Sequence, residues 1–538
     1  MSNWNVVLSS GCVTWAFLKR MALGRIKRSY FGGLRVKFSP TNVALVIMRF
    51  HALFRRFPEP APWTRQPQAL FIGAVAWRAK STAAASACSS AINPVNPFEV
   101  QPGCLQPGLS ATDFQDRRGK LFATMPNNSA LLSNAAVVKY MTHDIPWEFH
   151  QNSNFMYLTG LEEPDALAVL VKSQNKCSFV LFVSPRDPRS EQWDGARIGI
   201  DEAKDRYLAD EAFSLTDLAQ AMQKLLSGVD KVFVLKPDGG GRFSQTFIEA
   251  TQSFHSKFVA GDFLVEQLRM VKSETELDRM RFAADIGAQG FLDMMKYTRA
   301  GMSELALGSI FEGSIKKNGA LWNAFPNVVG SGSNAAVIHY LAKRGLLREH
   351  ELVLVDSGCE VAGGYASDIT RTWPVGGKLS AAQVMLYEFV LDVQKKCIDH
   401  LRRSIKSKES ISLNDLHDYS VDIMMKQMLE LGIMKDRSAS ASAMREFQKY
   451  NPTYIGHYLG MDVHDTPHIT RNMPLVPGMV ITVEPGIYLP KTDVDLPEEF
   501  RGIGIRIEDD VVITSTGIEI MTSKVPKKLK EMEALRCN

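Results

Sequence analysis

The feature that most constrains the fold of this chain is a set of acidic residues at the ends of apolar strands in its C-terminal half. Two apolar runs end directly in Asp356 and Glu484. Asp368 follows twelve residues after Asp356, where an antiparallel return strand is expected, and Glu508 lies in a strand of alternating residues. A single acid at such a place is ordinarily a turn or cap residue. Together they predict a site, because burying an unpaired carboxylate costs on the order of several kcal/mol.

Two histidines lie close to these acids in the sequence. His457 and His464 are seven residues apart in a glycine-flanked segment. A lone histidine is usually structural, but a pair near acids favours a metal site. Arg506 lies two residues before Glu508 and therefore shares its face of the strand. The inward-facing set that we expect is Asp356, Asp368, His457, Glu484 and Glu508.

Four carboxylates packed together would repel one another and become partly protonated. Two divalent cations would neutralise them, and the imidazole would add a neutral ligand. Oxygen ligands with one nitrogen suit manganese, cobalt or zinc, and the lack of thiolates argues against a structural zinc site. Two such ions, about 3.5–4 Å apart, would hold a hydroxide as the nucleophile of a hydrolase.

Length and composition indicate a globular protein. The chain has 538 residues, of which 45% are hydrophobic and 22% charged. At about 150 residues per domain this predicts two or three domains. No stretch reaches the roughly 18 apolar residues of a membrane span. The seven cysteines lack Cys-x-x-Cys spacing, which favours a reducing compartment over a disulfide scaffold.

The first 98 residues carry a formal charge of +12, and the remainder carries −8. A leader rich in Ser, Ala and Arg and poor in acids is typical of an organelle transit peptide. The alternative is a basic arm that binds nucleic acid. We favour the leader, because its charges are spaced among apolar residues, and we expect no nucleic-acid partner.

The remaining sequence predicts an α/β domain followed by an α+β domain. In the first, strands are expected at 166–171, 178–183 and 231–235, with a helix at 215–226. In the second, helices are expected to start after Ser273, Ser303, Ser380 and Ser412. Strands are expected at 352–355, 365–374, 479–488, 503–508 and 511–514, as one curved antiparallel sheet with the helices on one face. The expected divisions are 1–105 (leader and disordered linker), 106–268 and 269–530.

Five ordered motifs resemble the aminopeptidase P branch of the pita-bread metallopeptidases, over about residues 110–525. The motifs are Asp356-Ser-Gly-Cys, Tyr365-Ala-Ser-Asp-Ile-Thr-Arg-Thr-Trp-Pro, Gly456-His-Tyr-Leu-Gly-Met-Asp-Val-His-Asp, Thr482-Val-Glu-Pro-Gly-Ile-Tyr and Arg506-Ile-Glu-Asp-Asp. Segments 191–197 and 325–340 fit as well, and the chain is most similar to the mitochondrial group of Xaa-Pro aminopeptidases 3 and intermediate-cleaving peptidases. The resemblance implies a creatinase-like N-terminal domain before a pita-bread catalytic domain.

The resemblance also implies a role for each site residue. Asp356, Asp368, His457, Glu484 and Glu508 would bind two metal ions, typically manganese, with Glu484 also as the proton shuttle. His339 and His464 would hold the scissile carbonyl and the tetrahedral intermediate, and Arg506 would orient the carboxylates. One position departs from the family pattern, because Thr453 stands where relatives often have a further histidine.

The function implied is removal of one N-terminal residue from peptides or imported precursor proteins, with Xaa-Pro or intermediate-cleaving specificity left open. The implied location is the mitochondrial matrix, with the plastid as the alternative, and the implied assembly is a homodimer or tetramer. Three other functions are weighed against this one. They are a catalytically silent pita-bread binding protein, a two-metal phosphoester hydrolase, for which only the basic residues Arg371 and Arg506 lie near the site in the sequence, and a cysteine hydrolase that uses Cys359 and His457.

Overall fold

The computed structural model describes residues 99–536 apart from 175, 238–243 and 439. The predicted basic leader lies outside the described residues. A short strand, β1 (Cys104–Gln106), already begins within the segment predicted as linker, because it pairs with β2 (Leu109–Ser110). All described residues belong to one compact unit of the chain, 77–538.

The N-terminal part is built on a six-stranded sheet in the order β6-β5-β4-β3-β7-β8. Its strands are β3 (Ser129–Asn134), β4 (Leu167–Lys172), β5 (Cys177–Val183), β6 (Glu211–Ser214), β7 (Lys231–Val234) and β8 (Phe258–Ala260). Strand β4 is antiparallel to both β3 and β5, and the other three pairings are parallel. The three predicted apolar strands of this region are therefore confirmed as β4, β5 and β7.

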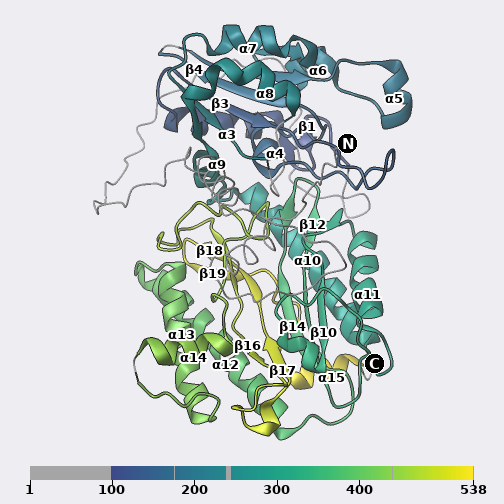
Figure 1. Ribbon diagram of the computed structural model, residues 1–538, viewed down its shortest axis with the longest axis vertical. Helices are drawn as coiled ribbons and strands as arrows, with labels where there is room; N and C mark the ends of the chain where they lie inside the picture. Colours follow the sequence, from purple (N-terminus) through teal and green to yellow (C-terminus); the bar gives the residue numbers. More distant parts are fainter. Residues whose placement is uncertain (1–98, 175, 238–243, 439, 537–538) are drawn as a thin grey trace, which may run out of the picture. The chain divides into compact units, whose positions relative to one another are not determined.

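Helices cover both faces of this sheet, which explains why its strands are continuous apolar runs (Figure 1). On one face, Leu131 packs in the same core as Phe114 and Phe155, from α3 (Ala111–Thr124) and α4 (Ser153–Thr159). On the other face, Leu132 packs with Met222, from α7 (Leu218–Leu226), and beside α8 (Gln245–Thr251). The shorter helices α5 (Pro188–Asp194), α6 (Gly199–Arg206) and α9 (Asp262–Arg269) complete this part.

The four helix starts predicted for the C-terminal part are confirmed. Ser273, Ser380 and Ser412 each form a capping box, and Ser303 accepts a hydrogen bond from the backbone N–H of Ala306. They open α10 (Glu274–Tyr297), α11 (Glu304–Lys317), α12 (Ala381–Ser407) and α13 (Leu413–Glu430). Two further helices, α14 (Ala441–Tyr450) and α15 (Leu529–Arg536), complete the set in the described residues. No described helix is both long and apolar enough to cross a membrane.

The strands of the C-terminal part form four short antiparallel sheets instead of the single curved sheet that we expected. Their orders are β10-β11-β14, β13-β12-β9, β15-β18-β19 and β16-β17. The strands are β9 (Trp322–Asn323), β10 (Val328–Ser331), β11 (Leu352–Ser357), β12 (Cys359–Val361), β13 (Tyr365–Ala366), β14 (Ile369–Pro374), β15 (Val480–Val483), β16 (Gly486–Leu489), β17 (Ile503–Arg506), β18 (Asp509–Thr514) and β19 (Gly517–Ile520).

Two of the predicted strands are broken where their acidic residues lie. The run 365–374 divides into β13 and β14 around Asp368, whose N–H donates to the carboxylate of Asp510 instead of to a neighbouring strand. The run 479–488 divides into β15 and β16 at Glu484, which is followed by Pro485, a residue without an N–H. Each break places an acidic side chain between two sheets.

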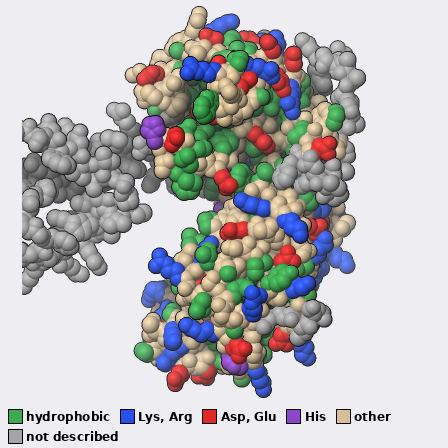
Figure 2. All heavy atoms as spheres, turned by 90° about the vertical axis from the view of Figure 1, so that its right-hand side faces the viewer, with side chains coloured by type: hydrophobic (Ala, Val, Ile, Leu, Met, Phe, Trp, Pro, Cys, Tyr) green, Lys and Arg blue, Asp and Glu red, His purple; other side chains and the backbone are tan. Residues whose placement is uncertain are grey.

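The surface of the described residues carries both signs of charge. On the face shown in Figure 2, lysine and arginine side chains alternate with aspartate and glutamate side chains. The largest buried cluster includes Trp373 and Phe291, whose rings are in edge-to-face contact at 6.3 Å between centroids.

Candidate metal centre

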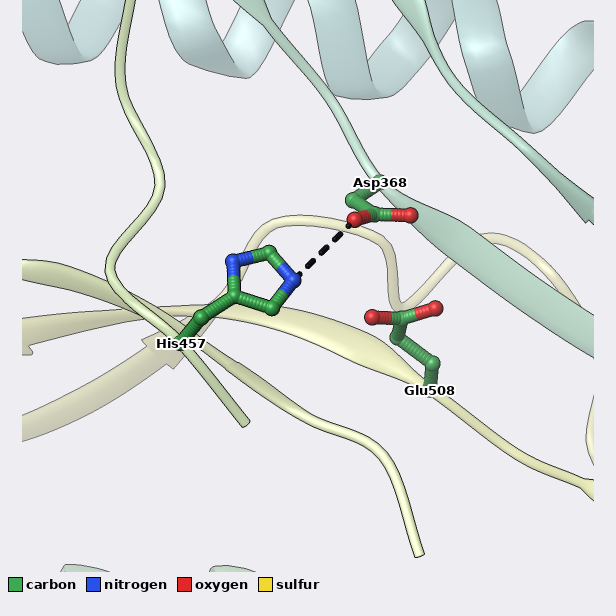
Figure 3. A group of neighbouring side chains, drawn as sticks. All are labelled: Asp368, His457 and Glu508. Carbon is green, nitrogen blue, oxygen red and sulfur yellow. Dashed lines mark ion pairs between the residues drawn. The ribbon is translucent and has the colours of Figure 1, made fainter. Parts of the chain in front are cut away.

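Three of the predicted site residues converge on one point (Figure 3). One possible ligand atom from each of Asp368, His457 and Glu508 lies within 4.8 Å of the others. His457 Nε2 lies 3.4 Å from Asp368 Oδ2. Asp368 precedes β14, Glu508 joins β17 to β18, and His457 lies in the loop after α14. The chain thus brings together residues that are up to 140 positions apart in the sequence.

The other two predicted members of the set lie beside these three. Glu484 Oε1 is 3.5 Å from His457 Nε2. Asp356 lies at the end of β11, paired across the ladder with Thr370 of β14, and its charge acts on Asp368 and Glu508. The side chains of Asp356, His457 and Glu484 are 14%, 15% and 16% exposed, so the cluster is reached from solvent.

Two glycines allow the backbones around the cluster to approach one another. A Cβ at Gly358 would lie 1.9 Å from the carbonyl oxygen of Ser367, beside Asp368. A Cβ at Gly456 would lie 2.0 Å from the carbonyl oxygen of Thr482, beside His457. Any larger residue would push the site-bearing segments apart, which explains the glycines that flank these motifs in the sequence.

The electrostatics of the cluster favour a cation. Burial, and then the neighbouring carboxylates, hold the pKa of Asp368 and that of Glu508 well above their usual range. Burial also raises the pKa of Glu484. Among the described residues, Oδ1 of Asp356 and Oδ1 of Asp368 are buried without a hydrogen-bond partner. Oxygen atoms left unpaired in this way fit divalent metal ions, which would supply the missing partners.

A layer of hydrogen bonds orients these carboxylates. Arg506 donates from Nη2 to Asp356 at 2.5 Å, from Nη1 to the Tyr488 hydroxyl at 2.6 Å and from Nε to the Thr370 hydroxyl at 3.0 Å. Thr370 in turn donates to Glu508 Oε2 at 2.6 Å. Arg506 thus contacts Asp356, one of the carboxylates that it is predicted to orient. The sequence did not lead us to predict Thr370 or Tyr488 as site residues. For Thr370 a signal was present, because it lies two residues after Asp368 and therefore on the same face of the strand.

The two acids after Glu508 were also missed, and they differ from each other. Asp510 accepts the N–H of Asp368 at 3.1 Å, and burial raises its pKa well above the usual range. Asp509 is paired with Arg371 at 2.7 Å and lies outside the cluster. Three consecutive acids in a buried strand segment were the available signal, because only paired or metal-bound acids are stable there.

The two remaining predicted histidines are neighbours of the cluster. The ring of His464 packs edge-to-face on that of His457 at 4.5 Å between centroids. Burial, and then the charges of His457 and His339, lower the pKa of His464 to about 4. His464 is therefore neutral near pH 7 and carries one N–H donor. His339 lies on an exposed loop and is near enough to His464 to act on it electrostatically.

The segment that carries both His457 and His464 is anchored to the rest of the chain. Asp465 is buried and forms ion pairs with Arg269 at 2.5 Å and Lys272 at 3.0 Å. Arg269 also donates to Asn154 of α4 at 2.8 Å. The N-terminal part of the chain thereby helps to hold the histidine segment in place.

Two of the alternative functions meet physical obstacles. The cysteine hydrolase is wrong, because Cys359 is fully buried and burial raises the pKa of its thiol to about 12. The phosphoester hydrolase needs free basic side chains. Arg371 is buried and paired with Asp509, and Arg506 is buried and paired with Asp356. Neither arginine is available to a phosphate.

Comparisons with known proteins agree with this geometry. The profile of metallopeptidase family M24 matches residues 278–515, and that of the aminopeptidase P N-terminal domain matches residues 114–234. The chain is 38% identical to Xaa-Pro aminopeptidase 3 of Rattus norvegicus, with 82% of this chain and 88% of the relative covered. It is 37% identical to the mitochondrial intermediate cleaving peptidase 55 of Arabidopsis thaliana, with 82% and 86% covered.

Solved structures show the same likeness. Aminopeptidase P from Escherichia coli, with the inhibitor Pro-Leu, superposes with a TM-score of 0.73 at 34% identity, over 80% of this chain and 98% of that chain. The expected fold class, a pita-bread catalytic domain preceded by a smaller creatinase-like domain, is confirmed, and the family implies divalent metal ions. The chain therefore belongs to the aminopeptidase P branch of metallopeptidase family M24 and is a metallo-aminopeptidase that acts on peptides.

Proposed function

We propose that the protein removes a single N-terminal residue from precursor proteins after their import into mitochondria, and that two metal ions bound by the acidic cluster support this reaction. The observation that carries the proposal is the convergence of Asp368, His457 and Glu508, with Glu484 alongside them. The unpaired buried oxygens of Asp356 and Asp368 add to it.

The metal ligands in this proposal are Asp356, Asp368, His457, Glu484 and Glu508, and the proposed metal is manganese, with zinc and cobalt as alternatives. When bound, such ions lower the pKa of a water molecule toward neutrality and polarise the substrate carbonyl. Because that chemistry depends on fixed ligand positions, Arg506 and Thr370 contribute by orienting Asp356 and Glu508.

The side chains around the cluster would carry out the remaining steps. Glu484, beside His457, would take the proton of the attacking water and pass it to the leaving nitrogen. His464, which is neutral, would donate its N–H to the oxygen that becomes negative in the transition state, and His339 would assist from the exposed loop. The cluster's acids would bind the free α-amino group of the peptide, which limits cleavage to the first bond.

A cleavage assay would test the activity and its specificity together. Peptides that begin with Xaa-Pro would be compared with peptides that begin with Tyr-Ser and Phe-Ser, each with a free or an acetylated N-terminus. We expect release of one residue from the free Tyr-Ser and Phe-Ser peptides and none from the acetylated ones. Preference for Xaa-Pro would assign the other specificity of the family, and loss of the acetylated residue would contradict the binding of the α-amino group.

The assembly, the location and the domain limits of the protein are proposed as well. We propose a homodimer or tetramer in the mitochondrial matrix, with catalytic residues in 269–530 and an N-terminal domain in 106–268. The relatives include a protein named as mitochondrial. Light scattering on the purified chain tests the assembly. Organelle fractionation followed by N-terminal sequencing of the mature protein tests the location, and a plastid fraction would replace the mitochondrial assignment.

A further inference from the structure

A fully buried carboxylate that belongs to none of the groups described above lies at the first residue of α11. Glu304 is 0% exposed and accepts hydrogen bonds from the N–H of Ser331 at 2.9 Å, the N–H of Gly345 at 2.6 Å and the side-chain amide of Asn334 at 2.8 Å. In the described part of the chain it forms no ion pair. Its charge is therefore balanced by N–H donors and by the N-terminus of α11.

All three donors belong to one segment, and this segment carries His339. The loop starts at Ser331, the last residue of β10, passes through the short helix η4 (Gly332–Ala336) and returns at Gly345. Glu304 binds both of its ends. The backbone of Glu304 adds a further bond, from its own N–H to the carbonyl of Gly345 at 3.0 Å. Glu304 thus holds the two ends of the loop, Ser331 and Gly345, close to each other.

A second set of contacts extends from Glu304 to the residue beside His339. The side-chain amide of Asn334, which donates to Glu304, also donates to the hydroxyl of Tyr340 at 3.1 Å. The Tyr340 ring packs on a small apolar cluster that includes Tyr488, the tyrosine bound by Arg506. His339 itself is exposed and forms no hydrogen bond or ion pair with the described residues, so its position depends on its neighbours in the loop.

We propose that Glu304 is a positioning residue for the peptidase reaction, which fixes the loop so that His339 faces the substrate beside His464. This inference rests on the proposed role of His339. A carboxylate suits the task because it accepts several N–H groups at once, and charged acceptors form the stronger hydrogen bonds. A glutamine would have to turn its NH₂ toward N–H donors, which leaves a buried donor unsatisfied.

The test is a double-mutant cycle between Glu304→Gln and His339→Ala in the full-length enzyme. We expect Glu304→Gln to lower kcat about tenfold, the lower end of the range for a residue that orients a functional group, with KM changed less than about twofold. Because the effect passes through His339, the same substitution in the His339→Ala background should change kcat less than about twofold. Bound metal should stay unchanged.

The matched control is Glu312→Gln on the same helix. Glu312 accepts the side-chain amide of Asn327 at 3.0 Å and forms no hydrogen bond or ion pair with the described loop 331–345, so we expect kcat to change less than about twofold. If Glu304→Gln fails to fold, Asn334→Ala replaces it in the cycle, because it removes the link to Tyr340 and leaves both backbone donors on Glu304.

Three results would overturn the inference. An equal loss of kcat in both backgrounds would show that Glu304 acts on the fold in general, and an unchanged kcat in the wild-type background would show no role at all. An unchanged kcat for His339→Ala alone would show that His339 has no role in the reaction. That result would contradict the proposed function and not only the role of Glu304, and it would be seen before the double mutant is made.

Discussion

At the scale of single residues, the unpaired oxygens of Asp356 and Asp368 explain why the cluster needs cations. Two other buried carboxylates among the described residues have cationic partners: Asp509 pairs with Arg371, and Asp465 pairs with Arg269. In the cluster, the nearest carboxylates repel one another, and Arg506 contacts only Asp356 among the four proposed acidic ligands. The acids of the cluster are thus arranged to bind cations that the polypeptide itself does not supply.

Removing one proposed ligand should abolish activity without unfolding the protein. We expect Asp368→Asn and Glu508→Gln to lower kcat more than about 100-fold, beyond the loss typical of residues that only orient ligands, and to reduce bound metal. Elemental analysis and peptide cleavage measure both. The control is Asp285→Asn, at an exposed aspartate paired with Lys524, where activity should be unchanged. Full activity in either ligand variant would refute the ligand assignment.

Thr453 should tolerate histidine. Its Oγ1 has no hydrogen-bond partner among the described residues, so its replacement breaks no bond, and it is outside the proposed ligand set. We expect Thr453→His to keep kcat within about threefold of the wild-type value, since the change is neither to a ligand nor to a bonded group. Steady-state kinetics decide this, and a tenfold loss would show that the threonine itself has a role.

The ion pair between His150 and Glu360 should make stability depend on pH. The hydrogen bond to Glu360 raises the pKa of His150 to about 9, from an ordinary value of 6.5. The stabilisation is thus complete below pH 6.5 and is lost as the pH rises through about 9. His150 is 49% exposed, so we expect less than about 1 kcal/mol.

Urea unfolding of wild type and His150→Gln would measure this effect at about pH 6 and about pH 10. The difference in free energy of unfolding between the two proteins should shrink toward zero at the higher pH. A difference that is constant with pH would mean that the ion pair does not contribute.

At the scale of elements, helix starts were predictable and strand breaks were not. Ser273 and Ser380 carry local capping signals that act within four residues, so sequence alone locates those helices. The breaks at Asp368 and Glu484 depend on partners far away, such as Asp510, which accepts the N–H of Asp368. For the same reason the residue types of the site could be predicted, while the contact between Arg506 and Tyr488 could not.

The short distance between Gly456 and β15 allows a prediction about how these two elements pack. Gly456→Ala would place a Cβ about 2.0 Å from the Thr482 carbonyl, so the segment before His457 must move away from β15. We expect a loss of about 1–3 kcal/mol of stability, as for overpacked sites, together with weaker metal binding. Thermal unfolding and metal titration measure the two effects.

The matched control is Gly313→Ala in the interior of α11, where a Cβ meets nothing within 4 Å. That change should stabilise the protein by up to about 1 kcal/mol, the difference in helix propensity. Equal effects of the two substitutions would mean that crowding at Gly456 does not shape the site.

At the scale of the whole molecule, buried polar contacts join the N-terminal and C-terminal parts. Arg117 of α3 forms an ion pair with Glu276 of α10 at 3.2 Å and donates to the Tyr365 hydroxyl at 3.1 Å. The sequence predicted that an α/β region precedes the catalytic region, from hydrophobic patterns alone. It could not predict these contacts, because pairing of buried residues 248 positions apart leaves no local pattern.

The dependence of the enzyme on two metal ions is tested most directly by adding metal back to the metal-free protein. The protein would be stripped with a chelator, and manganese would be added while bound metal and release of the first residue from a Tyr-Ser peptide are measured together. We expect no activity without metal and full activity at two ions per chain. Activity that survives complete removal of metal, or that is complete with a protein in which Asp368 and Glu508 are both replaced, would contradict this expectation.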